Sequence, residues 1–200
     1  MNTQAIFMRL GCAAMLAALA FAPSAQGQNG NGNPKPKISF QPILAFSDQS
    51  ALPGGGSILA RAKDGVYMSY HSFGLPAGTV ATAWWVFFNE PKRCATSPCG
   101  LPDLFTNPDA QPSLVYATGR MVGADGTADF GAFRAVGDTT GAQFGPGLLD
   151  PRKAEIHLVI RTHGPALDDP ALLSQQLSSF NGGCPTPNTC ANLQVSIHQP

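Results

Sequence analysis

The sequence predicts an all-β protein: an antiparallel β-sandwich of immunoglobulin-like shape, with seven to eight strands and one short helix near the C-terminus. Three observations support this fold class. The run TVATAWWVFFN, residues 79–89, is apolar on both faces of an extended chain. Other short segments of β-type composition are separated by Gly, Pro and Asp-Gly turn signals. The chain also lacks the regular alternation of strands and helices that a parallel α/β sheet requires.

Residues 82–89 form the segment around which the other strands are expected to lie. Strand side chains alternate between the two faces of a sheet. One face therefore carries Trp84, Val86 and Phe88, and the other carries Ala83, Trp85 and Phe87. Because both sets are apolar, neither face is expected to remain in water. A buried helix is the competing interpretation of a short apolar run, but aromatic and β-branched residues favour a strand, and both tryptophans are expected to pack in the core.

The first 27 residues have the pattern of a secretory signal peptide. Arg9 is the only charge before the apolar run at 10–22, and small residues follow that run. The run is too short for a membrane-spanning helix, which needs about 20 apolar residues. Residues 28–37, QNGNGNPKPK, have too few apolar groups to offset chain entropy and predict a disordered linker. The predicted organisation is a signal peptide at 1–27, a linker at 28–37 and one β-sandwich domain at 38–200.

The charge balance argues against two classes of partner. Twelve Lys and Arg residues balance twelve Asp and Glu residues, and no run of like charge occurs. Nucleic acids and anionic membranes both call for a basic patch, so neither is predicted as a partner. No second apolar run of spanning length follows the leader, so we expect no transmembrane segment once the signal peptide is removed.

Four cysteines remain when Cys12 is removed with the leader, and they form two close pairs in the sequence. An exported chain meets oxidising conditions, so we predict the disulfides Cys94–Cys99 and Cys184–Cys190. The competing interpretation is a four-cysteine zinc site. Structural zinc sites usually have two residues between paired cysteines, whereas these gaps are four and five residues. The leader and the cysteine pairs together predict a secreted or periplasmic location.

The remaining strands are predicted from alternation and from turn signals. They cover residues 38–46, 58–63, 65–73, 113–122, 127–136, 154–163 and 191–198. The segment LPGGGS at 52–57 is expected to be a loop. Two longer Gly- and Pro-rich loops, 90–112 and 137–153, separate later strands, and loops of this length are usually functional or loosely ordered.

One helix signal precedes the last strand. Asp169 is a capping residue, and Pro170 occupies the first helical position. Leu173, Leu177 and Phe180 would share one apolar stripe of this helix. A Gly-Gly pair at 182–183 is expected to end it.

Five segments of the chain carry a resemblance to known proteins. They are LPAG…AWWVFFN (75–89), YATG (116–119), VGADGTADF (122–130), FGPGLLDP (144–151) and EIHLVIRTHGP (155–165). On these segments the chain resembles a group of uncharacterised, exported bacterial proteins related to the CHRD (chordin-type) β-sandwich domain. The resemblance covers most of the chain after residue 55. It implies an extracytoplasmic β-sandwich and no particular activity. CHRD-type domains often carry a His-x-His pair on a strand, whereas His157 and His163 are six residues apart here.

Histidines on predicted strands are the main candidates for a site. His157 and His163 have the same parity, so an uninterrupted strand points both to one face. Their separation is about 20 Å along a strand, too far for one metal ion unless a bulge intervenes. His71 on a neighbouring strand would be an easier partner for His157. The candidate metal ligands are therefore His71, His157 and His163, and the alternative is that His157 is a hydrogen-bonded residue at the sheet surface or under a loop.

Arg161 stands among apolar residues in the same segment. A structural ion pair with Asp138, Asp150 or Glu155 would tie the second long loop to the strand. Alternatively, Arg161 and His163 form an anion-binding cluster. With His157, these two are the candidate ligand-binding residues.

No motif predicts catalysis. The chain has no G-x-S-x-G elbow, no H-E-x-x-H, no P-loop and no dinucleotide fingerprint, so no catalytic residue is predicted. We therefore expect an exported, non-enzymatic module without a cofactor. It would bind an envelope protein, a polymer or a small ligand through loops 90–112 and 137–153, or have a structural role. The alternative is a metal-binding protein or metal-dependent enzyme that holds a transition metal with the strand histidines.

Overall fold

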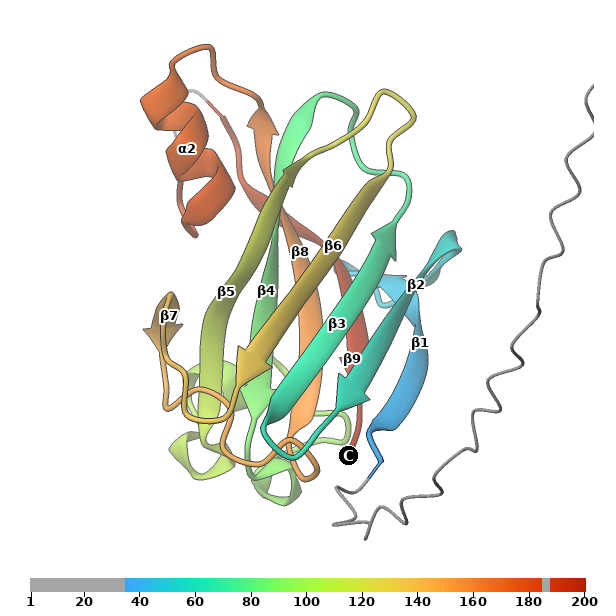
Figure 1. Ribbon diagram of the computed structural model, residues 1–200, viewed down its shortest axis with the longest axis vertical. Helices are drawn as coiled ribbons and strands as arrows, with labels where there is room; N and C mark the ends of the chain where they lie inside the picture. The colour runs from blue at the N-terminus through green and yellow to red at the C-terminus, as the bar shows by residue number, and fades with distance from the viewer. Residues whose placement is uncertain (1–34, 185–187) are drawn as a thin grey trace, which may run out of the picture. The chain divides into compact units, whose positions relative to one another are not determined.

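The computed structural model describes residues 35–184 and 188–200. The predicted signal peptide at 1–27 and residues 28–34 of the predicted linker lie outside the described residues. Nine antiparallel strands form one curled sheet (Figure 1). They are β1 (Lys37–Ala45), β2 (Ala51–Arg61), β3 (Gly65–Ser72), β4 (Thr79–Phe88), β5 (Pro112–Met121), β6 (Ala128–Ala135), β7 (Ala142–Phe144), β8 (Glu155–Pro165) and β9 (Ala191–His198). Their order across the sheet is β6-β3-β2-β1-β9-β8-β4-β5-β7.

The prediction of an all-β, antiparallel protein is confirmed, and the sheet has nine strands where the sequence predicts seven to eight. The additional strand is β7, which forms inside the second long loop. It pairs with β5 over a short stretch, with Phe144 opposite Leu114. Three residues are too few for the alternation that identifies a strand in sequence.

The segment LPGGGS belongs to β2, so the prediction of a loop there was wrong. The register between β1 and β2 shifts at this point: Gln41 is opposite Ser57, but Ile43 is opposite Leu52. The glycines therefore form an irregular, bulged part of a continuous strand. Gly55 is required because a Cβ there would lie 2.7 Å from Cδ1 of Ile43 and 2.9 Å from the carbonyl oxygen of His71.

The curl of the sheet encloses an interior core. In Figure 1, β3 and β6 lie in front of β8 and β9, and the turn after β5 leads directly into β6. The core between them includes Tyr70, Trp85, Phe87, Phe130 and Leu158, all fully buried. This burial of apolar area is the main stabilising contribution to the sheet.

The opposite face of β4 contributes to a second cluster, which we call the outer core. It contains Trp84, Val86 and Phe88 of β4, together with Leu114 of β5 and Val159 of β8. All ten residues of β4 are buried. The prediction that β4 is covered on both faces, with alternate residues on each, is therefore confirmed.

Short helices and turns cover the outer core. The first long loop contains η1 (Pro91–Arg93), α1 (Leu101–Phe105) and η2 (Pro108–Ala110). The helix α2 (Pro170–Ser178) precedes β9, and Asp169 caps it by accepting from the amides of Ala171 and Leu172. No helix within the described ranges is long and apolar enough to cross a membrane.

The predicted apolar stripe of α2 is only half-buried: Leu173, Leu177 and Phe180 are all partly exposed. The buried side chain of the helix is Gln176, whose Nε2 donates to the carbonyl oxygens of His163 and Pro165 and whose Oε1 accepts from the amide of Leu167. The helix ends at Ser178, so Phe180 lies beyond it. The fully buried contact of the helix is thus polar, and it supplies partners for backbone groups at the end of β8.

Candidate functional site

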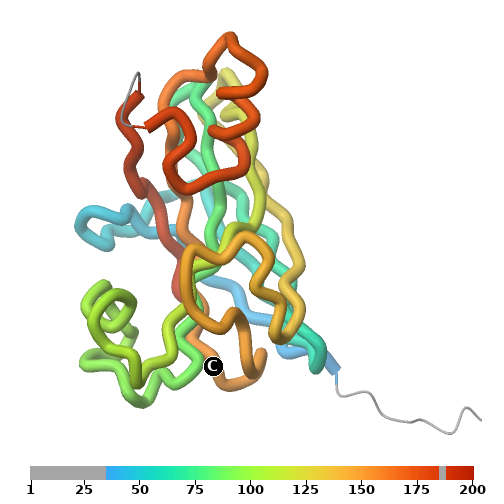
Figure 2. Tube along the Cα trace, turned by 90° about the vertical axis from the view of Figure 1, so that its left-hand side faces the viewer, coloured from blue at the N-terminus to red at the C-terminus, as the bar shows by residue number. Residues whose placement is uncertain are grey.

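A pocket of about 480 Å³ lies over the outer core, and we call it the outer pocket. Its floor and walls include Trp84, Val86, Val159, Val195, Phe46 and Phe180. Residues from the segment 98–105 cover one end. Besides β4, β5 and β8, the lining comes from residues 90–112, the β1–β2 connection and the segment that includes β9, which Figure 2 draws in light green, blue and red.

The lining of the outer pocket is mainly aliphatic and aromatic. Its polar side chains are Gln49, His157 and Asn192. Small-molecule sites are usually largely pre-formed pockets of about 300–1,000 Å³ with apolar walls and a few placed polar groups. The outer pocket has both properties. Trp84 forms T-shaped pairs with Tyr116 and Phe180, with ring centroids 5.5 and 5.0 Å apart, so its position is fixed by packing.

The segment that covers the pocket is held by a disulfide and by one buried carboxylate. The disulfide Cys94–Cys99 is formed, as predicted. Asp103 accepts from the amides of Ala95 (2.8 Å) and Gly100 (2.9 Å) and from the side chain of Asn107 (3.0 Å). Burial raises the pKa of Asp103, but these hydrogen bonds outweigh it and hold the pKa below its ordinary value.

His157 lies at the covered end of the pocket and is paired with a buried carboxylate. Glu155 Oε1 accepts from His157 Nε2 at 2.7 Å and from the amide of Cys99 at 2.7 Å. The imidazole also contacts Phe88, with ring centroids 5.1 Å apart. The cover of the pocket is therefore connected directly to the Glu155–His157 pair.

Arg161 lies on the same face of β8, beyond Val159. Its Nε donates to the carbonyl oxygen of Phe180 (2.8 Å), and an amino group donates to Asn192 (3.1 Å). The guanidinium also stacks 4.2 Å from the centre of the Phe180 ring. The expected ion pair is not formed among the described residues: Asp138 pairs with Arg134, Asp150 with Lys153 and Glu155 with His157. The sequence did not show that Arg134, Lys153 and His157 lie closer to these three carboxylates than Arg161 does.

His163 is fully buried and belongs to a chain of hydrogen bonds that we call the hydroxyl relay. Its Nδ1 donates to the carbonyl oxygen of Gly182 (2.9 Å), so its Nε2 accepts from the hydroxyl of Thr82 (2.8 Å). That hydroxyl in turn accepts from Nε1 of Trp84 (2.7 Å). Burial, and to a lesser extent the charge of Arg161, lower the pKa of His163, against an opposing effect of the Gly182 bond. The imidazole is therefore neutral.

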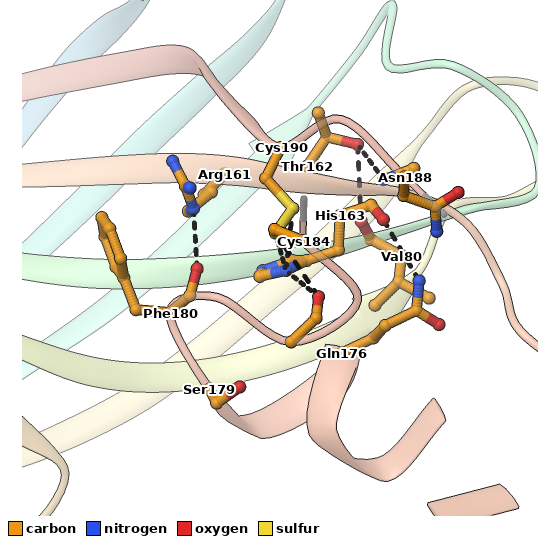
Figure 3. The surroundings of a disulfide bond; sticks show 12 residues. Val80, Arg161, Thr162, His163, Gln176, Ser179, Phe180, Cys184, Asn188 and Cys190 are labelled. Atoms are coloured by element: carbon orange, nitrogen blue, oxygen red, sulfur yellow. Dashed lines mark hydrogen bonds between the residues drawn. A yellow bond between two sulfur atoms is a disulfide. The ribbon is translucent and has the colours of Figure 1, made fainter. Parts of the chain in front are cut away.

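The predicted disulfide Cys184–Cys190 is also formed, and it packs beside His163 (Figure 3). Both sulfur atoms lie 3.8 Å from His163 Nδ1. These three side chains have a spacing suited to metal ligands. As they stand, the sulfur atoms are bonded to each other and Nδ1 carries a proton, so none of them offers a free electron pair of the kind a metal requires.

The structure does not bring the three candidate histidines together. His71 lies on β3, exposed, with Nδ1 2.6 Å from Asp129. Three strands, β2, β1 and β9, lie between β3 and β8 in the sheet. His157 and His163 share β8 but belong to different networks, so no two of the three converge on one point.

Two buried polar groups near the site were missed from the sequence. His198, the last residue of β9, lies within 2.8 Å of the hydroxyls of Ser39 and Ser57 through its two ring nitrogens. Ser57 also bonds to Ser196. A serine beside a histidine can act as nucleophile and base, but Ser57 and His198 are both buried, and they are bonded to each other and to Ser196 and Ser39.

Arg61 is the second missed group, and it is fully buried at the end of β2. Its guanidinium donates to four backbone carbonyl oxygens, those of Pro151 (2.7 Å), Ala154 (2.8 Å), His198 (2.9 Å) and Gln199 (3.1 Å). Burial lowers the pKa of Arg61 to about 10, and the charge of Glu155 opposes that shift. Arg61 therefore holds together the start of β8 and the end of β9, the two strands beneath the covered end of the pocket.

The fold and the pocket together define an all-β protein with a candidate small-molecule site on the outer face of its sheet. A scan against protein-family models gives no match, and comparisons with curated proteins and with solved structures give none either.

Proposed function

We propose that this chain is an exported binding module that holds a small, mainly apolar molecule in the outer pocket. The observation that carries the proposal is the pocket of about 480 Å³, which is lined by outer-core side chains and has a disulfide-bonded segment over one end. An apolar pocket of this size leaves its lining in contact with water, with few apolar partner atoms on the open side. A bound apolar molecule would supply those contacts and displace water from the aromatic walls.

The lining favours binding over catalysis. Apart from the disulfide-bonded Cys99, His157 is its one titratable side chain. Among the lining residues of the described chain, no second reactive group accompanies His157, whereas nucleophilic or acid–base catalysis needs at least two positioned groups. Of the two loops expected to bind, 90–112 contributes several lining residues and 137–153 contributes none.

The location and the finer fold class belong to the same proposal. Two disulfides and the leader pattern favour a secreted or periplasmic protein. The interior core between β3, β6 and β4, β8 favours an immunoglobulin-like, CHRD-type sandwich in which the sheet has folded over itself. N-terminal sequencing of the chain recovered from the cell envelope or the medium would test export, since a retained residue 1 contradicts it.

Titration with N-phenyl-1-naphthylamine, an apolar dye that fluoresces when it leaves water, tests ligand binding. We expect saturable binding with one dye per chain. Val159 lies on the pocket floor, so Val159→Phe would fill the pocket and weaken dye binding at least about tenfold. Ile58→Phe makes a similar change at an exposed site away from the pocket and should have no effect. The proposal is wrong if the wild type does not bind the dye, or if both variants bind it equally.

A further inference from the structure

One polar side chain stands out in the apolar lining of the outer pocket. His157 is only 8% exposed, and it is paired through Nε2 alone. Its Nδ1 has no hydrogen-bond partner among residues 35–184 and 188–200. This atom is nevertheless not fully shielded from solvent, unlike the unpaired buried atoms in that part of the chain. Glu155 is not part of the lining, so a bound molecule would meet the pair only through the imidazole.

The contact between Glu155 and His157 Nε2 determines the hydrogen-bonding role of His157 Nδ1. A carboxylate oxygen accepts hydrogen bonds, so the shared proton of the Glu155–His157 contact lies on Nε2. In the neutral form of the ring, Nδ1 carries a lone pair and acts as an acceptor, and that form is the one the inference concerns. Because Glu155 Oε1 is also bonded to the amide of Cys99, the ring is held in place by the cover of the pocket.

The charges around the pocket argue against an anionic ligand. A carboxylate head at this end would lie close to the carboxylate of Glu155. Arg61 is sealed behind the lining and uses its guanidinium on four backbone carbonyls. Arg161 is bonded to Phe180 and Asn192 at the other end of the pocket. A neutral donor with an apolar body is the chemistry that fits an unpaired acceptor here.

We propose that the outer pocket selects apolar molecules that carry a neutral O–H donor, a phenol or an alcohol, and that His157 Nδ1 accepts that hydrogen bond. This inference rests on the proposed function. A ligand of the same shape without the donor would bury Nδ1 without a partner and would therefore bind more weakly. Sites that hydrogen-bond one ligand discriminate against close analogues in this way.

Competition against the bound dye with three probes tests the inference: 4-pentylphenol, its methyl ether 4-pentylanisole, and 4-pentylbenzoate. In the wild type we expect the phenol to bind at least about tenfold more tightly than the ether, and the benzoate to be the weakest. In His157→Phe, which keeps a flat ring but removes the acceptor, the phenol and the ether should bind equally. On the folded wild type, the ¹⁵N shift of His157 Nδ1 should move with the phenol and stay unchanged with the ether, which tests the contact even if the variant does not fold.

The outcomes separate the inference from the proposed function. If the dye binds but the phenol and the ether compete equally, or if the benzoate is the strongest competitor, the inference is overturned and the binding module stands. A phenol preference that persists in His157→Phe assigns the selectivity elsewhere and also overturns it. If neither the dye nor any probe binds, the proposed function fails and the inference fails with it.

Discussion

Replacing Arg61 with methionine removes the group that joins the start of β8 to the end of β9. The side chain is fully buried, and methionine keeps most of its length and apolar stem. The change leaves the carbonyl oxygens of Pro151, Ala154, His198 and Gln199 without their donor. It also removes the positive charge that interacts with the buried carboxylate of Glu155, which keeps its contact with His157.

The size of the effect follows from these partners. Gln199 is exposed, so water replaces the guanidinium there, and three buried carbonyls remain unpaired. Each unpaired buried group costs about 1–3 kcal/mol. The desolvation of the guanidinium, which is evident from its lowered pKa, is relieved and offsets part of this cost. We expect a net loss of about 3–5 kcal/mol, the range typical of removing one partner from a buried ionic network.

Urea denaturation followed by tryptophan fluorescence measures this loss, because Trp84 and Trp85 are buried in the native state. For a domain of this size the melting temperature should fall by about 6–20 °C. Arg61→Lys keeps the charge with fewer, differently placed donors and should lose about 1–2 kcal/mol. Arg152→Met, at an exposed position on the adjacent turn, should change stability by less than about 0.5 kcal/mol. If Arg61→Met is as stable as Arg152→Met, the reasoning about the buried guanidinium is refuted.

Three further predictions concern the buried polar networks and the cover of the pocket. Burial, followed by the charges of Arg61 and His157, lowers the pKa of His198 from 6.5 to about 4. Between these two pH values the unfolded chain is protonated at His198, whereas the native chain is not. The free energy of unfolding should therefore fall by about 3 kcal/mol as the pH falls from 6.5 to 4, and His198→Gln should flatten that slope in urea titrations at several pH values. Thr82→Val interrupts the hydroxyl relay and should cost about 2–4 kcal/mol, whereas Thr82→Ser keeps the hydroxyl and should cost less than about 1 kcal/mol; equal losses would contradict the relay. Replacing Cys94 and Cys99 with serine should cost about 2 kcal/mol of stability and should weaken dye binding as well, so unchanged dye affinity would contradict the role of the cover.

The sequence identified most of the strands because their signal is local. Both faces of β4 are apolar, and this pattern alone predicts a strand with neighbours on either side. The cap of α2 was equally clear, since Asp169 followed by Pro170 is typical of the first residues of a helix. The bulged glycines of β2 were missed because the same residues form loops when no neighbouring strand is near.

The candidate site was only partly predictable. Parity on β8 predicted that His157 and His163 share one face of an uninterrupted strand, but the pairing with β9 shifts register between Ile160 and Arg161. Which loop covers each histidine depends on contacts far apart in sequence. The pairing of Glu155 with His157 is a two-residue spacing that occurs often by chance, so it gave no usable signal. Phe180 became part of the pocket because α2 ends before it, and helix ends are poorly defined by an apolar stripe.

The position of β4 in the sheet has a consequence for how the chain reaches its native state. One neighbour, β5, follows after a single loop, but the other, β8, begins only at Glu155. A chain that has emerged as far as β5 therefore presents an unpaired apolar edge that is prone to join the same edge of another chain. The edge of β4 is covered only when β8 pairs with it, and contacts between segments so far apart in sequence slow folding. We expect the incomplete chain, in which β8 has not yet paired with β4, to aggregate more readily than the native protein.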